Sequence, residues 1–200
     1  MISAIVLAAG ESRRMGETKL ILDWQGKPIL QHVLDAMRDS PVGEVILVLG
    51  HEAERIQGRI QAPEVKIVIN PDYREGMSTS LRRGILAADP DTQAFLVVLA
   101  DQPGINPQII AELILNFHQG YPGKNIIVPD FRGRRGHPVL FGAKYREEIL
   151  GLKGDVGGRK ILAEHPEDIL TVEMNGDDVL VDIDTPEDYK RHLPSSASPK

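Results

Sequence analysis

The chain has 200 residues, of which 42% are hydrophobic and 26% are charged, close to the averages of soluble globular proteins, which excludes collagen, coiled coil and wholesale disorder. Its 23 Lys and Arg against 29 Asp and Glu give a formal net charge of −6, which disfavours broad binding of nucleic acid phosphates. There is no cysteine, so disulfides, thiolate metal sites and a cysteine nucleophile are excluded, and any metal must be held by oxygen or imidazole.

The first residues contain one short apolar run with no basic residue before it, unlike a secretory signal peptide. No stretch approaches the roughly 18 apolar residues that a membrane helix needs. We therefore expect a cytoplasmic protein that binds neither membrane nor nucleic acid.

Short apolar runs rich in β-branched residues recur along the first two thirds of the chain. They are nearly continuous rather than alternating, as in strands of a parallel sheet that is covered by helices on both faces. The predicted strands are residues 2–7, 45–49, 65–69, 95–99 and 126–128. Helical spacing fills the intervals, most clearly over residues 28–37 and 107–117. This alternation predicts an α/β fold with a doubly wound, mostly parallel, Rossmann-like sheet.

The pattern changes after about residue 130. A glycine-rich basic turn leads into a short strand within residues 131–142, which predicts a small antiparallel insertion near the sheet edge. Helices at about 143–150 and 158–165 and strands at 169–174 and 179–183 follow, and Thr185-Pro186 fits the start of a last helix. We expect one domain over residues 1–193 and a disordered, polar tail over residues 194–200.

A glycine-rich loop, LAAGESRRMGETK, follows the first predicted strand. Loops at the carboxyl ends of parallel strands often bind nucleotide phosphates. Gly10 and Gly16 let backbone amides approach phosphate oxygens, while Arg13, Arg14 and Lys19 supply cations. The loop is neither a Walker A loop nor a G-x-G-x-x-G fingerprint, and a flexible surface turn explains it equally well. Triphosphate binding is therefore a hypothesis at this point.

Acidic residues follow two distant strands of the predicted sheet. Asp101 comes after the fourth strand, and Asp182 and Asp184 lie near the end of the last one. If the fold gathers them, two carboxylates with phosphate oxygens and waters suit magnesium. As an alternative, Asp101 caps the turn before Pro103 and Asp184 initiates the last helix.

Several motifs together resemble a known family. LAAGESRRMGETKL is similar to the signature L-A-A-G-x-S-x-R-M-G-x-x-K-L of nucleotidyltransferases with the nucleotide-diphospho-sugar transferase fold. Further motifs follow in the family's order, so that the likeness covers about residues 2–190: NPDYREGMSTSLRRGI, LADQPGI, RGHPVLF, GDVGGRKIL and VDIDTPEDY. The chain most resembles the molybdenum cofactor cytidylyltransferases, relatives of the molybdopterin-guanine dinucleotide synthases.

The resemblance implies a role for each matching position. Lys19, Arg14 and Asp101 are implied as catalytic residues, and Asp101 and Asp184 as magnesium ligands with Asp182 in reserve. The implied nucleotide-binding residues are Leu7, Ala8, Ala9, Gly10, Ser12, Arg13, Arg14, Gly16, Lys19, Asn70, Gly76, Ser78 and Ser80.

The base is expected against residues 76–81. Hydroxyls of Ser78, Thr79 and Ser80 precede a helix predicted to start near Leu81, and they can equally well cap that helix. The resemblance places this segment at the nucleotide base. Ala8-Ala9-Gly10 matches the cytosine users of the family, whereas the guanine users carry L-A-G-G, so we expect CTP rather than GTP.

The acceptor is expected near the second basic cluster, which Arg132, Arg134, Arg135 and His137 form. This cluster is complementary to a phosphate-bearing acceptor, although a solvated turn explains it as well. The resemblance implies these acceptor-binding residues: Arg135, His137, Gly154, Asp155 and Arg159.

The expected reaction is the transfer of CMP from magnesium-bound CTP to the terminal phosphate of molybdopterin, with release of pyrophosphate. The expected partners are CTP, molybdopterin and a recipient molybdoenzyme. Two alternatives stay open. One is a nucleotidyltransferase that uses GTP or another acceptor, such as a sugar or polyol phosphate. The other is a non-catalytic protein that binds the molybdenum cofactor and delivers it to a molybdoenzyme.

Overall fold

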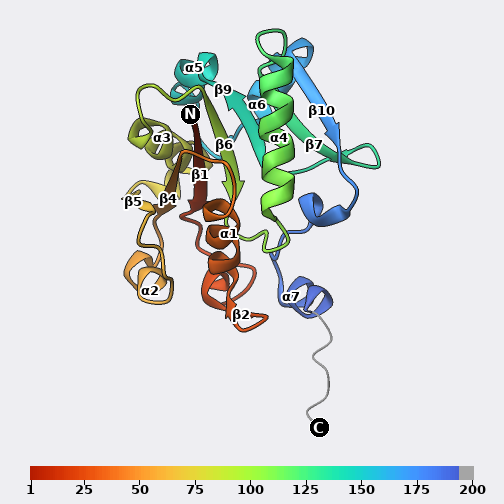
Figure 1. The fold of residues 1–200 in the computed structure, drawn as a ribbon. Helices are drawn as coiled ribbons and strands as arrows, with labels where there is room; N and C mark the ends of the chain where they lie inside the picture. Colours follow the sequence, from red (N-terminus) through yellow and green to blue (C-terminus); the bar gives the residue numbers. More distant parts are fainter. Residues whose placement is uncertain (194–200) are drawn as a thin grey trace.

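A computed structural model describes residues 1–193, which form one twisted sheet between two layers of helices (Figure 1). The sheet has eight strands, in the order β10-β7-β9-β6-β1-β4-β5, with β8 paired to β7. The strands are β1 (Ile2–Ala8), β4 (Glu44–Leu49), β5 (Lys66–Ile69), β6 (Ala94–Leu99), β7 (Ile126–Phe131), β8 (Arg134–Arg135), β9 (Val139–Gly142) and β10 (Ile169–Glu173). Pairs among β1, β4, β5 and β6, and β7 with β10, are parallel. The predicted doubly wound, mostly parallel sheet is confirmed.

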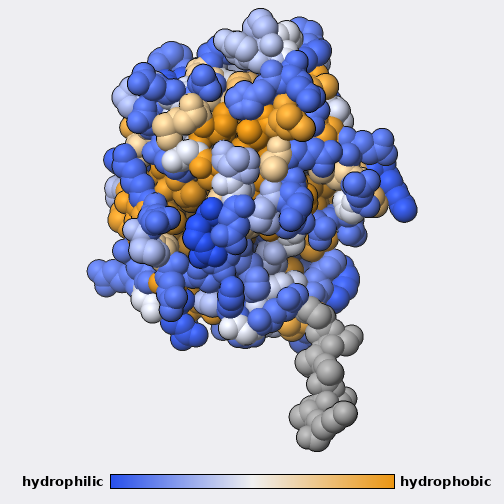
Figure 2. Space-filling view, in the orientation of Figure 1, coloured by the Kyte–Doolittle hydropathy of each residue, from blue (hydrophilic) through white to orange (hydrophobic). Residues whose placement is uncertain are grey.

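Helices cover both faces of this sheet. On the side that faces the viewer in Figure 1 lie α1 (Ile29–Arg38) and α4 (Pro107–Gly120), and on the other side lie α3 (Met77–Ala87), α5 (Arg146–Leu150) and α6 (Arg159–Glu164). The short α2 (Ala53–Gln57) packs Ile56 on the α1 side, and α7 (Pro186–His192) lies beyond the carboxyl edge of the sheet. On the viewer's face, apolar side chains gather over the upper middle and the left, and hydrophilic side chains cover most of the rest (Figure 2). Within residues 1–193, no helix has the length and apolarity to cross a membrane.

The two-layer cover explains why the strands are apolar at every position. In β1, Ala4 and Val6 pack into the core on the α1 and α4 side, while Ile5 packs into the core on the α3 side, and all three are fully buried. Successive side chains of a strand point to opposite faces, so a strand covered on both sides must be apolar throughout.

The antiparallel insertion lies inside the sheet, so its expected place near the edge is wrong. β9 pairs with β6 on one side and with β7 on the other, and all four of its residues are buried. A strand that is apolar on both faces needs cover on both, which the edge of this sheet does not supply. Only the exposed two-residue β8 extends β7 outward as a hairpin.

The strand predicted over residues 179–183 does not form. A 3₁₀ turn, Asp177–Leu180, is followed by backbone without regular structure. The carbonyl of Val179 accepts a hydrogen bond of 2.9 Å from the His137 N–H, and the Ile183 N–H donates one of 3.0 Å to the carbonyl of Asp101. Val179 and Ile183 are fully buried. Their side chains are therefore apolar because they pack into the core, although their backbone joins no strand.

A third, small core fixes this segment against the end of the first loop. It consists of Trp24 from the β2 (Asp23–Trp24) and β3 (Lys27–Pro28) hairpin, Ile29 and Ile183, with Tyr189 of α7 packed on it. The rings of Trp24 and Tyr189 lie 6.0 Å apart. Because Ile183 is held here, Asp184 is placed beside the first loop. The polar tail expected over residues 194–200 lies outside the described residues.

Candidate active site

The candidate residues meet at the carboxyl edge of the sheet. β1 and β6 are parallel neighbours, with Leu7 opposite Leu99, so the loops that follow them leave side by side. The hydrogen bond from Ile183 to the carbonyl of Asp101 adds the segment before α7 to the same place. This topology brings together residues that are far apart in the sequence.

Lys19 is the centre of the site. Its Nζ donates to Asp101 Oδ2 at 2.6 Å and to Asp184 Oδ1 at 2.8 Å, and Arg14 Nη2 pairs with Asp184 Oδ2 at 2.8 Å. The side chain of Lys19 is 12% exposed, whereas that of Arg14 is 70% exposed. Burial disfavours the ammonium, but the two carboxylates outweigh it and raise the pKa of Lys19. The site therefore holds a charged ammonium between two acids.

The reserve residue Asp182 differs from Asp184. Burial and the negative charges of Asp184 and Asp101 raise the pKa of Asp182. Burial also opposes ionisation of Asp184, but Lys19 and Arg14 outweigh it and lower the pKa of that carboxyl. Asp184 is thus the better anionic ligand of the two.

The donor set fits a hard divalent cation that arrives with further oxygen ligands. Asp101 and Asp184 already direct one oxygen each at a single cation, the Lys19 ammonium, and the buried Asp101 Oδ1 has no partner in the described part of the chain. Among residues 1–193, no three His, Asp or Glu side chains group closely enough to hold a metal by themselves. Two carboxylates completed by phosphate oxygens and waters match the usual protein binding of magnesium.

The first loop encloses a hollow of about 230 Å³ beside Lys19. Ser12 turns the loop with φ of 50°, its carbonyl accepts from the Met15 N–H at 2.9 Å, and its Oγ accepts from the Lys19 N–H at 3.4 Å. Gly10 has no atom within 4 Å of the place a Cβ would take, which leaves its backbone open to a ligand. The predicted residues that line this hollow are Leu7, Ala8, Gly10, Ser12, Arg13, Arg14, Lys19, Asp101 and Asp184.

A second hollow of about 540 Å³, here called the nucleotide groove, continues from the first loop to the start of α3. Ala9, Gly76 and Ser80 line it. Asn70 is fully buried behind it and donates from Nδ2 to Ser80 Oγ at 2.9 Å. Ser78 lines neither of these two hollows, and its buried Oγ has no hydrogen-bond partner among the described residues.

The helix expected near Leu81 begins four residues earlier, at Met77. Ser78, Thr79 and Ser80 therefore lie in the first turn of α3 rather than before it. The N-cap residue is Gly76, which has no side chain that could cap the helix. The loop at 154–155 caps the helix instead. The carbonyl of Gly154 accepts from the Ser78 N–H, and Asp155 Oδ1 accepts from the Met77 N–H, each at 3.3 Å.

This cap separates the five residues expected at the acceptor. A Cβ on Gly76 would lie 2.4 Å from the carbonyl carbon of Gly154, so the two segments are in direct contact. Asp155 lines the nucleotide groove, whereas Arg135, His137 and Arg159 line a different hollow. The structure thus places Gly154 and Asp155 on the side of the expected base.

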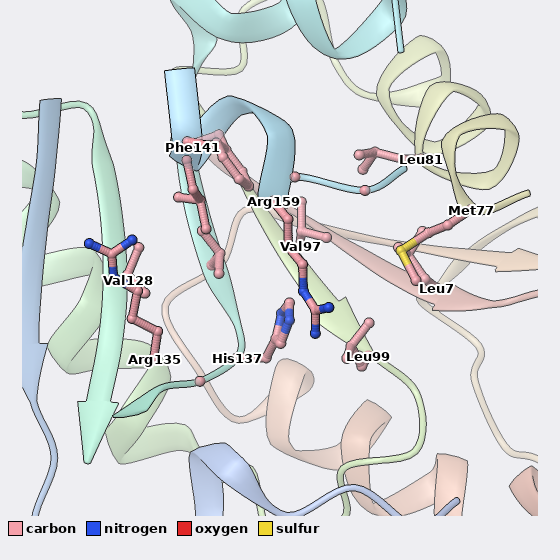
Figure 3. A pocket seen from close by; sticks show the side chains of 16 residues that line it. Leu7, Met77, Leu81, Val97, Leu99, Val128, Arg135, His137, Phe141 and Arg159 are labelled. Atoms are coloured by element: carbon pink, nitrogen blue, oxygen red, sulfur yellow. The ribbon is translucent and has the colours of Figure 1, made fainter. Parts of the chain in front are cut away.

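That third hollow, here called the apolar pocket, has a volume of about 350 Å³ (Figure 3). Its walls include Leu7, Val97, Leu99 and Phe141. The side chains of His137 and Arg159 lie next to each other in it, while the guanidinium of Arg135 lies on the far side of β9 from them (Figure 3).

His137 is neutral in this setting. Burial and the charge of Arg159 lower its pKa, against the pull of Asp101. Its buried Nδ1 has no hydrogen-bond partner within residues 1–193. A neutral imidazole with one free nitrogen can accept or donate one hydrogen bond, depending on its tautomer.

Sequence reasoning missed two parts of the site. One is Arg74, which pairs with Glu11 at 3.1 Å while Glu11 also pairs with Arg13 at 2.5 Å; no local pattern announces that pairing. The other is the apolar wall, including Leu99 and Val97. Their place at the carboxyl end of a predicted strand was the available signal.

Comparison with known proteins agrees with this geometry. The model of the MobA-like NTP transferase domain matches residues 4–169. A molybdenum cofactor cytidylyltransferase of Escherichia coli is 27% identical over 94% of this chain and 93% of its own length. A nicotine blue oxidoreductase of Paenarthrobacter nicotinovorans is 28% identical over 96% of each chain.

A solved structure shows the same fold. The crystal structure of Rv0371c from Mycobacterium tuberculosis has a TM-score of 0.86 and 29% identity over 96% of each chain, and another structure of that protein was obtained with manganese. The architecture is the nucleotide-diphospho-sugar transferase fold, as the resemblance implied. The chain belongs to the family of MobA-like NTP transferase domains, which are nucleotidyltransferases.

Proposed function

We propose that this protein transfers CMP from CTP to the terminal phosphate of molybdopterin and forms molybdopterin cytosine dinucleotide. The observation that carries the proposal is the convergence of Lys19, Asp101 and Asp184 under a cationic, glycine-containing loop. The similarity to a molybdenum cofactor cytidylyltransferase supports the acceptor. The proposal includes a cytoplasmic location, where CTP is available, and a molybdoenzyme that receives the product.

Binding of the triphosphate is the task of the first loop. Its exposed Arg13 and Arg14 and the amide of Gly10 contact the phosphates. Lys19 gives up part of its bonding to the carboxylates and turns to a phosphate oxygen. Asp101 and Asp184 would hold magnesium, which supplies charge neutralisation and Lewis acidity at the phosphate when bound.

The chemical step needs no protein nucleophile. An oxygen of the acceptor's terminal phosphate attacks the α-phosphorus, a P–O bond to the acceptor forms, and the α–β bond breaks so that pyrophosphate leaves with its electron pair. The acceptor phosphate is already anionic, so no strong general base is required. Positioning and cationic charge supply the rate enhancement.

The apolar pocket supports an acceptor with a ring body. It opens beside the nucleotide hollows, since Leu7 lines all three. Its aliphatic and aromatic walls suit a planar ring better than a polyhydroxylated sugar, which would leave hydroxyls without partners. Arg159, which has no ion pair among residues 1–193, is available for an anionic group of the acceptor.

The test measures pyrophosphate release from pure protein with magnesium, CTP and molybdopterin. Parallel reactions replace CTP by GTP or UTP, and molybdopterin by sugar or polyol phosphates. Release that requires CTP and molybdopterin together supports the proposal. Release with a sugar phosphate but not with molybdopterin would identify a sugar phosphate as the acceptor. Tight molybdopterin binding by calorimetry without any turnover would instead identify a carrier protein.

A further inference from the structure

One carboxylate in the nucleotide groove forms no ion pair with a Lys or Arg side chain of residues 1–193. Asp155 lines the groove opposite the first loop, and its Oδ1 accepts a single hydrogen bond, of 3.3 Å, from the backbone of Met77. Glu11, on the other wall, is held between Arg13 and Arg74. Within residues 1–193, Asp155 has no such ion pair, so its carboxylate is free to accept hydrogen bonds from a ligand.

The position of Asp155 is fixed before any nucleotide binds. The preceding Gly154 accepts a hydrogen bond from the Ser78 N–H. Its backbone also lies against Gly76, where any Cβ would come within 2.4 Å. The loop is therefore held to the start of α3, and a hydrogen-bond acceptor stands at a defined place in the groove.

Ser80, unlike Asp155, can offer a hydrogen-bond donor to the groove. Asn70 Oδ1 accepts from the Asp72 N–H at 3.0 Å, which identifies Nδ2 as the end that donates to Ser80 Oγ at 2.9 Å. A serine hydroxyl has one donor hydrogen besides its acceptor lone pairs. No acceptor for that hydrogen is found among residues 1–193. Asn70 thus orients Ser80 as a donor towards the groove.

A donor beside an acceptor distinguishes the two pyrimidines. Cytosine carries an amino donor at N4 next to the acceptor N3, while uracil carries an acceptor at O4 next to a donor N3–H. Asp and Glu accept well from the amino group of cytosine. Uracil in the same orientation would set its O4 against the Asp155 carboxylate, leaving two hydrogen-bond acceptors facing each other without a donor.

We propose that Asp155 and Ser80 determine the base specificity of the nucleotide groove, with Asp155 accepting from the exocyclic amino group and Ser80 donating to the adjacent ring nitrogen. Asn70 acts as a positioning residue for Ser80. This inference rests on the proposed function, and it assigns Asp155 to the nucleotide rather than to the acceptor. For a pyrimidine ring held in this orientation, the pair favours CTP over UTP.

The experiment measures equilibrium binding of CTP and UTP with magnesium and without acceptor, by calorimetry. Five proteins are compared: the wild type, Asp155→Asn, Ser80→Ala, Glu75→Gln and the control Asp91→Asn. Asp91 is an exposed acid at the opposite edge of the sheet, so its variant makes the same charge change away from the groove. Asparagine retains an oxygen for the Met77 N–H, and thermal melts verify that each variant folds.

We expect the wild type and Asp91→Asn to prefer CTP over UTP by about tenfold to a hundredfold, the effect of a hydrogen bond to a charged group. In Asp155→Asn the amide can donate to O4, so the preference should fall to about equality or reverse. Ser80→Ala should weaken CTP binding more than UTP binding, because only cytosine has an acceptor at N3.

Three results would overturn the inference and leave nucleotidyl transfer standing. The first is a CTP preference that persists in folded Asp155→Asn. The second is a preference that disappears in Glu75→Gln instead, since Glu75 lines the same groove. The third is a wild type that binds CTP and UTP equally. A folded wild type that binds neither nucleotide contradicts the proposed function itself.

Discussion

The nucleotide hollows and the apolar pocket share Leu7 as a wall, yet opposite kinds of side chain build them. Around Lys19 the lining is charged and includes Arg14, Asp101 and Asp184. In the apolar pocket the lining is mostly aliphatic and aromatic, with Arg135, His137 and Arg159 as its polar side chains. The difference teaches that one sheet edge carries a charged hollow and an apolar one side by side, which fits the proposed division between handling of the triphosphate and recognition of the acceptor.

This separation has a measurable consequence. Variants around Lys19 should change the rate with every acceptor, because they act on the triphosphate. Variants in the apolar pocket should change the choice and affinity of the acceptor and leave nucleotide binding intact. Kinetics that vary each substrate independently distinguish the two classes.

The largest effect is expected for Lys19→Met. Methionine keeps an apolar stem of similar length but removes the ammonium that bonds to Asp101 and Asp184. Loss of one charge-stabilising donor at a reacting centre costs roughly a hundredfold to a thousandfold in kcat. Initial rates of pyrophosphate release measure this, with Lys27→Met as the control, since the half-exposed Lys27 pairs with Asp35 away from the site. Equal rates for the two variants would remove Lys19 from the reaction.

A smaller effect that is confined to the acceptor is expected for Arg159→Met. The guanidinium points into the apolar pocket beside His137 (Figure 3). Losing one charge-assisted hydrogen bond should raise the KM for the acceptor by roughly tenfold, with the KM for CTP unchanged. Lys160→Met is the matched control, because the exposed Lys160 neighbours it on α6 and lies near Glu164. A rise in the KM for CTP would contradict the division between pocket and groove.

The charged side of this comparison was the more predictable from sequence. Glycines, arginines and Lys19 are contiguous in one loop directly after a strand, so local pattern and topology point to the same place. Asp101 follows a strand parallel to β1, and the carboxyl ends of parallel strands meet at one edge. We expected Asp101 and Asp184 to lie near Lys19, and the structure gives the distances of these contacts.

The other side was less predictable because its placement depends on contacts distant in sequence. Val179 and Ile183 have a strand-like apolar pattern, but they plug loops, and periodicity cannot separate the two uses. Likewise, β9 is a short strand that finds its place between β6 and β7 only through pairing. The motif around Asp155 predicted a place at the acceptor. In the structure, the loop of Asp155 caps α3, and this contact places Asp155 in the nucleotide groove. No local sequence signal indicates that contact.

Carboxylates extend the comparison to the opposite edge of the sheet, where Asp168 supports the fold. Its side chain is 10% exposed and pairs with Lys144 at 2.7 Å, and it accepts from Tyr145 Oη at 2.5 Å. Burial opposes ionisation, but Lys144 and Tyr145 outweigh it, and the pKa of Asp168 is lowered. Its contribution to stability is therefore complete above about pH 4, the unfolded value, and is lost as the pH falls through the folded value.

Asp168→Asn should lower the free energy of unfolding at pH 7 by about 1–2 kcal/mol, the range for removing a charged hydrogen-bond partner. Urea denaturation at a series of pH values measures this. The curves of wild type and variant should converge as the pH falls below about 4. A constant difference down to pH 2.5 would show that the ion pair is not its origin.

The smallest effect has the opposite sign and concerns Asp182. Burial, Asp184 and Asp101 raise the pKa of this carboxyl, so its contribution to stability is full below the unfolded value near pH 4 and is lost as the pH rises through the folded value. In the metal-free protein at pH 7, Asp182→Asn should therefore raise Tm by roughly 1–2 °C, as expected for a change of at most about 0.5 kcal/mol.

The gain from Asp182→Asn should shrink as the pH falls from 7 to 4, because protonation of the wild-type carboxyl removes its repulsion by Asp184 and Asp101, and thermal melts in EDTA at the two pH values test this. The same variant separates the two candidate metal ligands. Asp184 is the carboxylate that already holds the Lys19 ammonium, so Asp184→Asn should weaken manganese binding in the presence of CTP, measured by electron paramagnetic resonance, while Asp182→Asn should not. Weaker manganese binding in Asp182→Asn alone would identify Asp182 as the ligand. In that case the charge of the metal would keep the Asp182 carboxyl ionised despite the repulsion from its neighbours.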